Sequence, residues 1–529
     1  MTDSSLPSKF GGQRAWLPGF LLLVIVAISL ANAAEIAFNP AHHDGAIFVY
    51  VGEMWAAGTV PYVQLFDNKP PGIFALIALA AHTHHTLWAL ALIEFLFVMA
   101  YILTVKKTLQ ICGASEGVVL FGTLGAAAMI NLHLYGAGNM TEVYMLWPMS
   151  ASMLAFLWAI ESRKIRYVFL AGLLSGVACM FKPFGLSALF AQIAFTCVQE
   201  RPKGRNCPAW ITVNAAGAAA AWIPVLAYFY LHNGLREVLD ASFLYNVHYG
   251  LASKGSALDI LTMLMTRLLP VSTIVVCLAL GMAELRKPTA EIPEARRSLW
   301  ILTLFWFGSG LVLVLAAGRG YGHYFMSLTP ALGLAAALFI WSIQERVPIR
   351  GLRLAIGALV FAPVVMAFFP GLAETIQDDK NGLLHHRNLT PVDVAAFQLR
   401  EIATPSSTLL VWGFEPWLFS STHLHNALRY PTTQYIYDSP RSYTDVGNEI
   451  LNGMRTSPPD FVVVTPSDSV INWPHQSDPV QEQFRDILQK SYKEVWNEDS
   501  YRIYRRDQGL ELEHSARKLQ PSDGSPRPN

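Results

Sequence analysis

Charge is scarce in this sequence: 14% of its 529 residues are Asp, Glu, Lys or Arg, whereas 53% are hydrophobic. A soluble domain carries more charge, so the composition excludes an ordinary soluble protein and favours one embedded in a membrane. The formal net charge is zero. A nucleic-acid-binding protein would carry an excess of basic residues, so no nucleic-acid partner is expected.

Cysteine is also rare, and none occurs after residue 277. The five cysteines are spread along the chain without a close pair, which excludes both a disulfide scaffold and a paired-cysteine zinc site. They are Cys112, Cys179, Cys197, Cys207 and Cys277.

Long apolar stretches are abundant instead. Stretches of about 18 or more apolar residues indicate transmembrane helices, and the pattern predicts a polytopic α-helical membrane protein with about eleven spans. The first span ends in Ala-Asn-Ala-Ala, as signal peptides do, but its length favours a membrane anchor over a cleaved signal. The expected spans are 17–34, 86–105, 117–132, 141–160, 167–180, 184–200, 209–231, 262–283, 299–316, 323–343 and 352–370.

Basic residues divide the loops into two alternating sets. One set, which includes the N-terminus, is rich in Lys and Arg, and the other holds few. The positive-inside rule therefore places the N-terminus in the cytoplasm and, with an odd number of spans, the C-terminal region outside. The residues then predicted on the outer face include Asp44, Glu142, Lys182, Tyr245 and Arg319.

The first outer loop, 35–85, is too long for a simple connection. Residues 44–57 predict a helix that lies along the membrane surface. Two prolines at 70 and 71 begin a second short apolar helix, because proline is tolerated in a first helical turn. The apolar side of the first helix is formed by Ile47, Val51, Met54 and Trp55.

The composition changes after residue 371, which predicts three parts: a membrane domain (1–370), a small outer α/β domain (371–506) and a disordered tail (507–529). The outer domain contains no Gly-rich phosphate loop and no nucleophile elbow. A helix begins after Thr390, where a Thr cap is followed by Pro in the first turn and an acid three residues on. Further elements are expected as strands at 407–412, 461–465 and 501–504 and a helix at 481–489.

Two acids on the outer face have two explanations each. Asp44 is either a general base that accepts a proton from an acceptor hydroxyl or amine, or the N-cap of the helix that it begins. The residue alone favours the N-cap. Glu142 is either a second catalytic acid or a solvated residue in a first helical turn, where the helix dipole favours it.

Three basic residues on the same face are candidate phosphate ligands. Lys69 lies two residues after Asp67 and either pairs with it or faces a phosphate. Lys182 interrupts two apolar segments and either snorkels to the interface or binds phosphate. Arg319 lies in a glycine-flanked turn, which is either a plain tight turn or a phosphate clamp.

Aromatic and histidine residues accompany these charges, at Tyr245-Asn246 and at His323-Tyr324. Aromatic residues are common at membrane interfaces, and they also stack on sugar rings. Each structural explanation is adequate for its own residue. Together, however, they would require unrelated causes to gather all these acids, basic residues and aromatics on one face of the membrane. The cytoplasmic loops carry basic charge but no comparable clusters of acids and aromatics. This asymmetry indicates an active site on the outer face.

These stretches give the chain its resemblance to a known class. It resembles the bacterial polytopic glycosyltransferases of the GT-C class, specifically the protein mannosyltransferase-like and ArnT-like branch of family 39. The Asp-Asn-Lys-Pro-Pro stretch after an outer-loop Asp is the most specific match. The matching stretches are Asp44-Gly45-Ala46, 55–62, 66–72, Thr141-Glu142, 181–183, Tyr245-Asn246, Arg319, His323-Tyr324 and 411–416.

The resemblance implies a GT-C fold and a transferase of the bacterial inner membrane. It would move a sugar from a polyprenyl-phosphate donor to a lipid, polysaccharide or protein acceptor at the outer face. Asp44 would activate the acceptor. Gly45 stands where many relatives carry Glu, so the role of that second acid is either unfilled or falls to Glu142. Lys69, Lys182 and Arg319 would hold the donor phosphate. The pocket would be shaped by Asp67, Tyr245, Asn246, His323 and Tyr324.

A divalent metal is used by some members of the class. The first outer loop has no Asp-x-Asp pair, so the sequence requires no metal, although His42 and His43 leave an opening for one.

Two other functions stay open. A transporter or lipid flippase would show charged residues at mid-membrane and inverted repeats, but Glu94 is the main charge within a span and no repeat is evident. A surface-polysaccharide polymerase or ligase would share Arg-rich outer loops without the pattern of Asp44 and Lys69.

Overall fold

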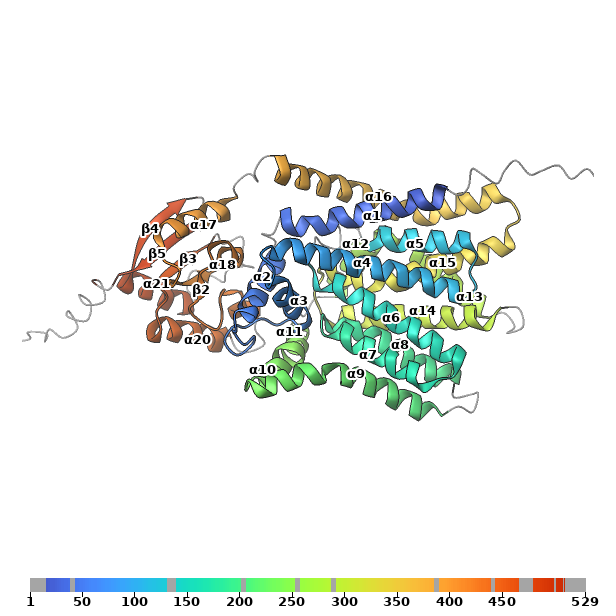
Figure 1. The fold of residues 1–529 in the computed structure, drawn as a ribbon, viewed down its shortest axis with the longest axis horizontal. Coiled ribbons are helices and arrows are strands. Elements are labelled where there is room, and N and C mark those ends of the chain that lie inside the picture. The colour runs from blue at the N-terminus through green and yellow to red at the C-terminus, as the bar shows by residue number, and fades with distance from the viewer. Residues whose placement is uncertain are drawn as a thin grey trace, which may run out of the picture. The chain divides into compact units, whose positions relative to one another are not determined.

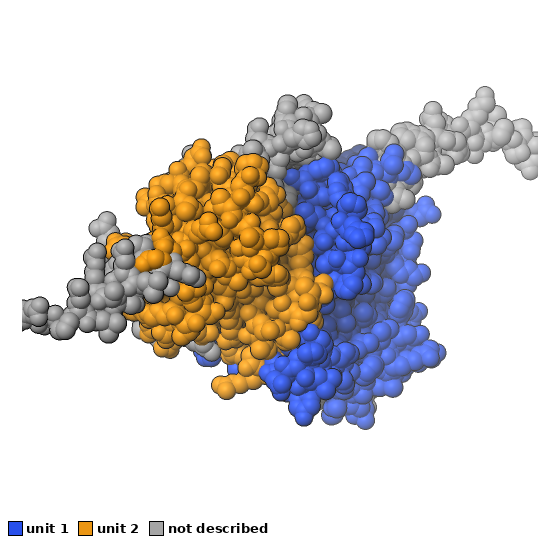
Figure 2. All heavy atoms as spheres, turned by 60° about the vertical axis from the view of Figure 1, so that its left-hand side comes forward, with its two compact units in different colours: residues 1–40, 69–235, 242–386 blue, residues 41–68, 236–241, 387–529 orange. Residues whose placement is uncertain are grey.

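The computed structural model describes residues 16–38, 43–130, 139–200, 206–252, 257–286, 292–384, 390–438, 443–465, 479–498, 501–507 and 509. They form two compact units, coloured blue and orange in Figure 2. Unit 1 comprises residues 1–40, 69–235 and 242–386, and unit 2 comprises residues 41–68, 236–241 and 387–529.

Unit 1 is a bundle whose long helices run side by side (Figure 1). Its α-helices are α1 (Trp16–Phe38), α3 (Gly72–Ala81), α4 (Thr86–Ile111), α5 (Glu116–Ile130), α6 (Thr141–Ser162), α7 (Ile165–Cys179), α8 (Ser187–Phe195), α9 (Cys207–Leu231), α11 (Tyr245–Ala252), α12 (Ala257–Leu268), α13 (Ser272–Leu285), α14 (Glu294–Ala316), α15 (Thr329–Arg346) and α16 (Arg350–Leu384). Shorter turns are the 3₁₀ helices η2 (Pro183–Leu186), η6 (Leu269–Val271) and η8 (Gly322–Leu328) and the π-helix η3 (Thr196–Glu200). The chain crosses between units in α10 (Leu235–Leu239) and the π-helix η5 (Asp240–Leu244).

Seven helical stretches among the described residues are long and apolar enough to cross a membrane. Five shorter apolar helices, including α5 and α7, accompany them. The protein is therefore a multi-pass membrane protein, as the sequence predicts, while the number of spans stays a prediction. The seven stretches are Thr86–Ile111, Thr141–Ser162, Cys207–Leu231, Leu258–Leu285, Glu294–Ala316, Gly322–Arg346 and Arg350–Ala367.

Small residues allow α7 and α9 to pack backbone against backbone. A Cβ atom on Gly172 would lie 1.9 Å from the carbonyl oxygen of Asn214, and one on Gly176 would lie 2.3 Å from that of Ala218. Because lipid supplies no hydrophobic force between helices, such close packing is a main source of helix association in membranes. It holds in place the C-terminal end of α7, where Lys182 follows.

Buried polar side chains connect the same helices. Gln192 of α8 donates to Ser152 of α6 at 2.7 Å, and Asn214 of α9 donates to Gln192 at 2.9 Å. Ser152 in turn donates to the carbonyl oxygen of Ala171 in α7 at 2.7 Å. These bonds satisfy polar groups that would be costly to leave unpaired in an apolar interior, and they join α6, α7, α8 and α9 into one frame.

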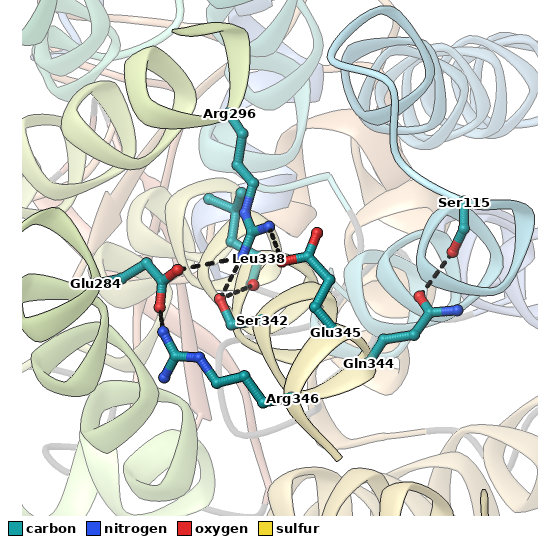
Figure 3. A network of polar contacts seen from close by, with 8 residues as sticks. All are labelled: Ser115, Glu284, Arg296, Leu338, Ser342, Gln344, Glu345 and Arg346. Atoms are coloured by element: carbon teal, nitrogen blue, oxygen red, sulfur yellow. Dashed lines mark hydrogen bonds and ion pairs between the residues drawn. The ribbon is translucent and has the colours of Figure 1, made fainter. Parts of the chain in front are cut away.

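A second polar network fastens the ends of α13, α14 and α15 (Figure 3). Arg296, 1% exposed, donates to Glu345 at 2.6 Å and to Ser342 at 2.7 Å, and lies 3.5 Å from a carboxylate oxygen of Glu284. Arg346 forms an ion pair with Glu284. The network joins the start of α14 to the end of α15, opposite the turn at 317–328 that connects these two helices.

Unit 2 contains a five-stranded mixed sheet in the order β2-β1-β3-β5-β4. β1 pairs in parallel with β2 and β3, whereas β5 pairs antiparallel with β3 and β4. Its elements are α2 (His43–Ala56), α17 (Pro391–Ile402), β1 (Thr408–Trp412), α18 (Trp417–Thr422), β2 (His425–Asn426), α19 (Gln434–Asp438), α20 (Tyr443–Thr456), β3 (Phe461–Val464), α21 (Pro479–Ser491), β4 (Tyr492–Glu498) and β5 (Tyr501–Arg506).

The predicted α/β character of the C-terminal region is confirmed. Strands β1, β3 and β5 and helix α21 lie where the sequence places them. Thr390 caps α17 in a complete capping box with Asp393. Strands β2 and β4 were not predicted, because β2 has only two residues and β4 (Tyr-Lys-Glu-Val-Trp-Asn-Glu) is an edge strand with mostly exposed side chains.

Helix α2 differs from the predicted surface helix. Residues Ala46 to Val51 are consecutively buried, each 3% exposed or less. A surface helix buries one side only, with a period near 3.6 residues. The middle of α2 is therefore buried on more than one side, which explains why its residues are apolar almost without interruption.

Candidate functional site

Glu142 and Lys182 form a buried ion pair in unit 1. Glu142 lies in the first turn of α6 and Lys182 directly before Pro183, the first residue of η2. The Lys182 ammonium group donates to a carboxylate oxygen of Glu142. The two residues are 7% and 1% exposed. Because an unpaired charge is costly to bury, each residue makes the burial of the other possible.

This pair excludes two of the structural explanations considered above. Glu142 does lie in a first helical turn, but it is not solvated. Lys182 does not snorkel toward water, since its ammonium group points at Glu142 within the protein. The second carboxylate oxygen of Glu142 accepts a hydrogen bond from Thr141 at 2.9 Å. Both charges are therefore held in fixed positions.

The turn before α15 adds His323 and Tyr324 to the pair. Nε2 of His323 lies 3.9 Å from a carboxylate oxygen of Glu142. Nζ of Lys182 lies 4.0 Å from the ring centre of Tyr324, a cation–π contact. The ring of Phe184 packs edge-on against Tyr324 at 5.1 Å. Four predicted site residues, drawn from three separate segments, thus converge on one point.

Arg319 in the same turn makes contact with α11. Its guanidinium carbon lies 4.3 Å from the ring centre of Tyr249, on which Tyr245 stacks at 6.2 Å. Gly250 allows this approach, because a Cβ atom there would lie 2.6 Å from the carbonyl oxygen of Ala316. The amide of Asn246 donates within its own helical segment, to the carbonyl oxygen of Ser242 at 3.1 Å. The turn at 317–324 therefore joins the aromatic residues of α11 to the Glu142–Lys182 pair.

Gly72, which follows Lys69 and two prolines, contacts the backbone just before Lys182. The amide of Gly72 donates to the carbonyl oxygen of Met180 at 2.8 Å, and a Cβ atom on Gly72 would lie 2.6 Å from that oxygen. Only glycine fits at this contact. Lys69 precedes Gly72 by three residues, a chain length of at most about 11 Å. The structure thus brings the backbone of Lys69 into the neighbourhood of Lys182.

Glu94 of α4 is a functional candidate to which the sequence alone assigns no role. It is 3% exposed, and its carboxylate accepts the backbone amide of Asn139 at 2.7 Å. Asn139 has a left-handed φ of 63° and accepts a hydrogen bond from Tyr144 at 3.4 Å. Glu94 therefore fixes the backbone that leads into Glu142. The signal in the sequence was the acid itself, since an ionisable residue within a span is a functional candidate.

The remaining predicted residues, Asp44 and Asp67, belong to unit 2. Asp44 is half-buried in the first turn of α2, which begins at His43, so it lies inside the helix and not at the N-cap. Asp67, 1% exposed, accepts a hydrogen bond from Tyr435 at 2.8 Å.

Metal ligation has no further support in the part of the chain that the structure describes. Among these residues no group of three or more His, Cys, Asp or Glu side chains is arranged to hold a metal ion. His42, one of the two histidines considered above, lies outside the described residues.

The chain has the fold of the GT-C class and is a multi-pass membrane protein. Residues 68–228 match the model of the family described as dolichyl-phosphate-mannose-protein mannosyltransferase. This segment includes Lys69, Glu142 and Lys182.

Two crystal structures of ArnT from Cupriavidus metallidurans share the fold. The structure bound to undecaprenyl phosphate is 13% identical with a TM-score of 0.58, and the apo structure is 14% identical with a TM-score of 0.60. Each comparison covers 93% of this chain and 99% of the other. No curated protein sequence matches the chain. The predicted resemblance to the GT-C class is confirmed.

Proposed function

We propose that this protein transfers a sugar from a polyprenyl-phosphate donor to a lipid, glycan or protein acceptor at the outer face of a bacterial inner membrane. The observation that carries the proposal is the buried Glu142–Lys182 pair, with His323 and Tyr324 beside it, inside a bundle of the GT-C fold. The match to a family named for a lipid-phosphate sugar donor supports this substrate class.

The donor phosphate is the natural partner of the basic residues. When the bond between the anomeric carbon and the phosphate oxygen breaks, the lipid phosphate gains negative charge, and prearranged cations stabilise that charge. Lys69, Lys182 and Arg319 are assigned this role. Glu142 holds Lys182 in place, so the ammonium group needs no reorganisation during the reaction.

The acceptor needs a base. Its hydroxyl or amine attacks the anomeric carbon as the phosphate leaves, and Asp44 takes the proton that the attacking atom loses. Asp44 lies in the first turn of α2. Asp67, Tyr245, Asn246, His323 and Tyr324 are assigned to the sugar and acceptor pocket. The rings of Tyr245, His323 and Tyr324 offer stacking faces there.

Membrane orientation completes the proposal. With the N-terminus in the cytoplasm, the distribution of Lys and Arg places Asp44, Glu142, Lys182 and Arg319 on the outer face together with the C-terminal α/β domain. Attaching a membrane-impermeant thiol reagent to single cysteines introduced into the loops tests this orientation.

The test of function is transfer of radiolabelled sugar from polyprenyl-phosphate donors in membranes. Asp44→Asn is compared with wild type at matched protein levels, because Asn is nearly isosteric but a poor proton acceptor. Wild-type transfer that is lost in Asp44→Asn supports the proposal. Transfer that persists in the variant removes Asp44 from the role of base. Donor binding without transfer by the wild type would favour a transporter instead.

A further inference from the structure

Residues 41–68, which carry Asp44 and Asp67, belong to the same compact unit as the C-terminal residues 387–529. More than three hundred residues of sequence separate the two segments, as the partners Tyr50 and Asn426 illustrate with a separation of 376. A surface loop of a membrane domain needs no such attachment. Within unit 2, three separate contacts fasten this segment to the C-terminal residues.

The first contact fixes α2. The Tyr50 hydroxyl donates to the side-chain oxygen of Asn426 and accepts from the backbone amide of the same residue, both at 2.8 Å. The Tyr50 ring stacks on Phe419 of α18 at 4.5 Å. Helix α2 packs beside α18 (Figure 1). This contact holds the helix whose first turn carries Asp44.

The second contact fixes the chain after α2. Arg429 donates through Nε to the carbonyl oxygen of Tyr62 at 3.0 Å, and its own carbonyl oxygen accepts the amide of Phe66 at 2.8 Å. Tyr62 is fully buried with a left-handed φ of 66°. A bulky residue adopts this conformation only where its surroundings enforce it, so the path of this segment is set by its contacts and not by local preference.

The third contact lies closest to the proposed phosphate ligand. The hydroxyl of Tyr435 donates to Asp67 at 2.8 Å, and both residues are nearly inaccessible, at 2% and 1% exposure. The Tyr435 ring also packs edge-on against Phe66 at 5.1 Å. Lys69 follows Asp67 by two residues, so the position of Asp67 restrains where the chain enters the Lys69 segment.

From these contacts we infer that the C-terminal α/β domain is the scaffold that positions the 43–68 segment, and that Tyr435 is a positioning residue for Asp67 and, through the chain, for Lys69. The inference rests on the proposed function for the roles of Asp44 and Lys69. According to this inference, the α/β domain affects catalysis by positioning the 43–68 segment, a role separate from acceptor selection. Loss of a contact within the domain therefore alters sugar transfer although no residue that touches the substrate has changed.

The experiment compares Tyr435→Phe with Tyr492→Phe in the full-length protein. Each substitution removes one hydroxyl from a buried ring of unit 2, and Tyr492 donates to the carbonyl oxygen of Pro459 at 2.9 Å, away from the 43–68 segment. Hydrogen exchange of residues 57–68 is measured together with transfer kinetics. We expect Tyr435→Phe to accelerate exchange in this segment about tenfold and to raise the donor KM more than it lowers kcat, because a buried hydrogen bond is lost. Tyr492→Phe leaves both unchanged.

The outcomes separate this inference from the proposed function. Unchanged exchange of residues 57–68 in Tyr435→Phe overturns the scaffold. Faster exchange with unaltered transfer kinetics overturns the link from Asp67 to Lys69. If the wild type transfers no sugar, the proposed function fails, while the exchange data still decide whether the scaffold exists. Should Tyr435→Phe not fold, Tyr50→Phe replaces it, with faster exchange expected in residues 43–56 and unchanged exchange there overturning the scaffold.

Discussion

The ammonium group of Lys182 is bonded to the carboxylate of Glu142, forty positions away in sequence and on a different segment of the bundle. Both residues are buried. Two opposite charges buried together in a membrane protein are costly to desolvate, and proteins retain them where the charges serve a function. Single and double substitutions at this pair can therefore distinguish its effect on the stability of the protein from its effect on sugar transfer.

Lys182→Met is expected to destabilise the protein by about 3–5 kcal/mol, because it leaves the Glu142 carboxylate buried without its cation. Transfer is expected to fall by about 100-fold or more, as when one donor to a developing charge is lost. Adding Glu142→Gln removes the unpaired charge and restores much of the stability but not the transfer. Thermal unfolding in detergent and transfer assays measure the two effects; recovery of both in the double variant would assign the pair a structural role only.

The network around Arg296 (Figure 3) provides the matched comparison, since it also buries charges. It lies at the start of α14 and the end of α15, whereas the 317–328 turn lies at their other ends. Arg296→Met is expected to lower the unfolding temperature, because Glu284 is 5% exposed and would lose this cation. Transfer per folded molecule is expected to stay near the wild-type value. A loss of transfer that exceeds the loss of folded protein would show that the network communicates with the 317–328 turn.

Glu94 is expected to act through the backbone that leads to Glu142. Glu94→Gln keeps an oxygen that accepts the Asn139 amide, so transfer should fall only a few-fold. Glu94→Leu removes the acceptor from a buried amide and should reduce transfer by about tenfold or more, because an unsatisfied buried donor costs about 1–3 kcal/mol. Transfer assays at matched protein levels distinguish the two. Equal losses in both variants would indicate that the charge of Glu94, and not its hydrogen bond, matters.

Burial raises the pKa of the Tyr501 phenol in unit 2 above its ordinary value of 10.0, and the adjacent Glu415 carboxylate, to which the hydroxyl donates at 2.9 Å, raises the pKa further. Because the pKa is higher in the folded state, the contribution of Tyr501 to stability is complete below pH 10 and is lost as the pH rises above that value. Unfolding temperatures between pH 8 and pH 11 should therefore decline less steeply in Tyr501→Phe than in wild type. Parallel curves would contradict this assignment.

Much of the fold could be predicted from the sequence because it depends on local patterns. Long apolar stretches identified the membrane helices, and the Thr390 cap placed α17 correctly. The pairing of Glu142 with Lys182 could not be predicted, since it depends on how α6 and α7 pack, and the sequence carries no pattern for contacts between distant segments. For the same reason the attachment of α2 to the C-terminal residues was not foreseen, and its apolar residues were interpreted as one side of a surface helix.

Gly72 tests whether the Lys69 segment and the Lys182 turn depend on each other. A Cβ atom there would lie 2.6 Å from the carbonyl oxygen and 2.9 Å from the carbonyl carbon of Met180, which are backbone atoms and cannot rotate away. Gly72→Ala is therefore expected to displace the turn that presents Lys182 and to reduce transfer by about tenfold or more, since small misplacements of a catalytic group are costly.

Gly308 of α14 is the control for this substitution, because a Cβ atom on it meets nothing within 4 Å. Gly308→Ala should be neutral or slightly stabilising, as alanine favours a helix by about 1 kcal/mol over glycine. If both variants retain wild-type transfer, the Gly72–Met180 contact has no part in positioning Lys182. If Gly72→Ala alone loses transfer while its unfolding temperature stays within a few degrees of wild type, the two lysine-bearing segments act as one structural element, and the conformation of each depends on the backbone contact between them.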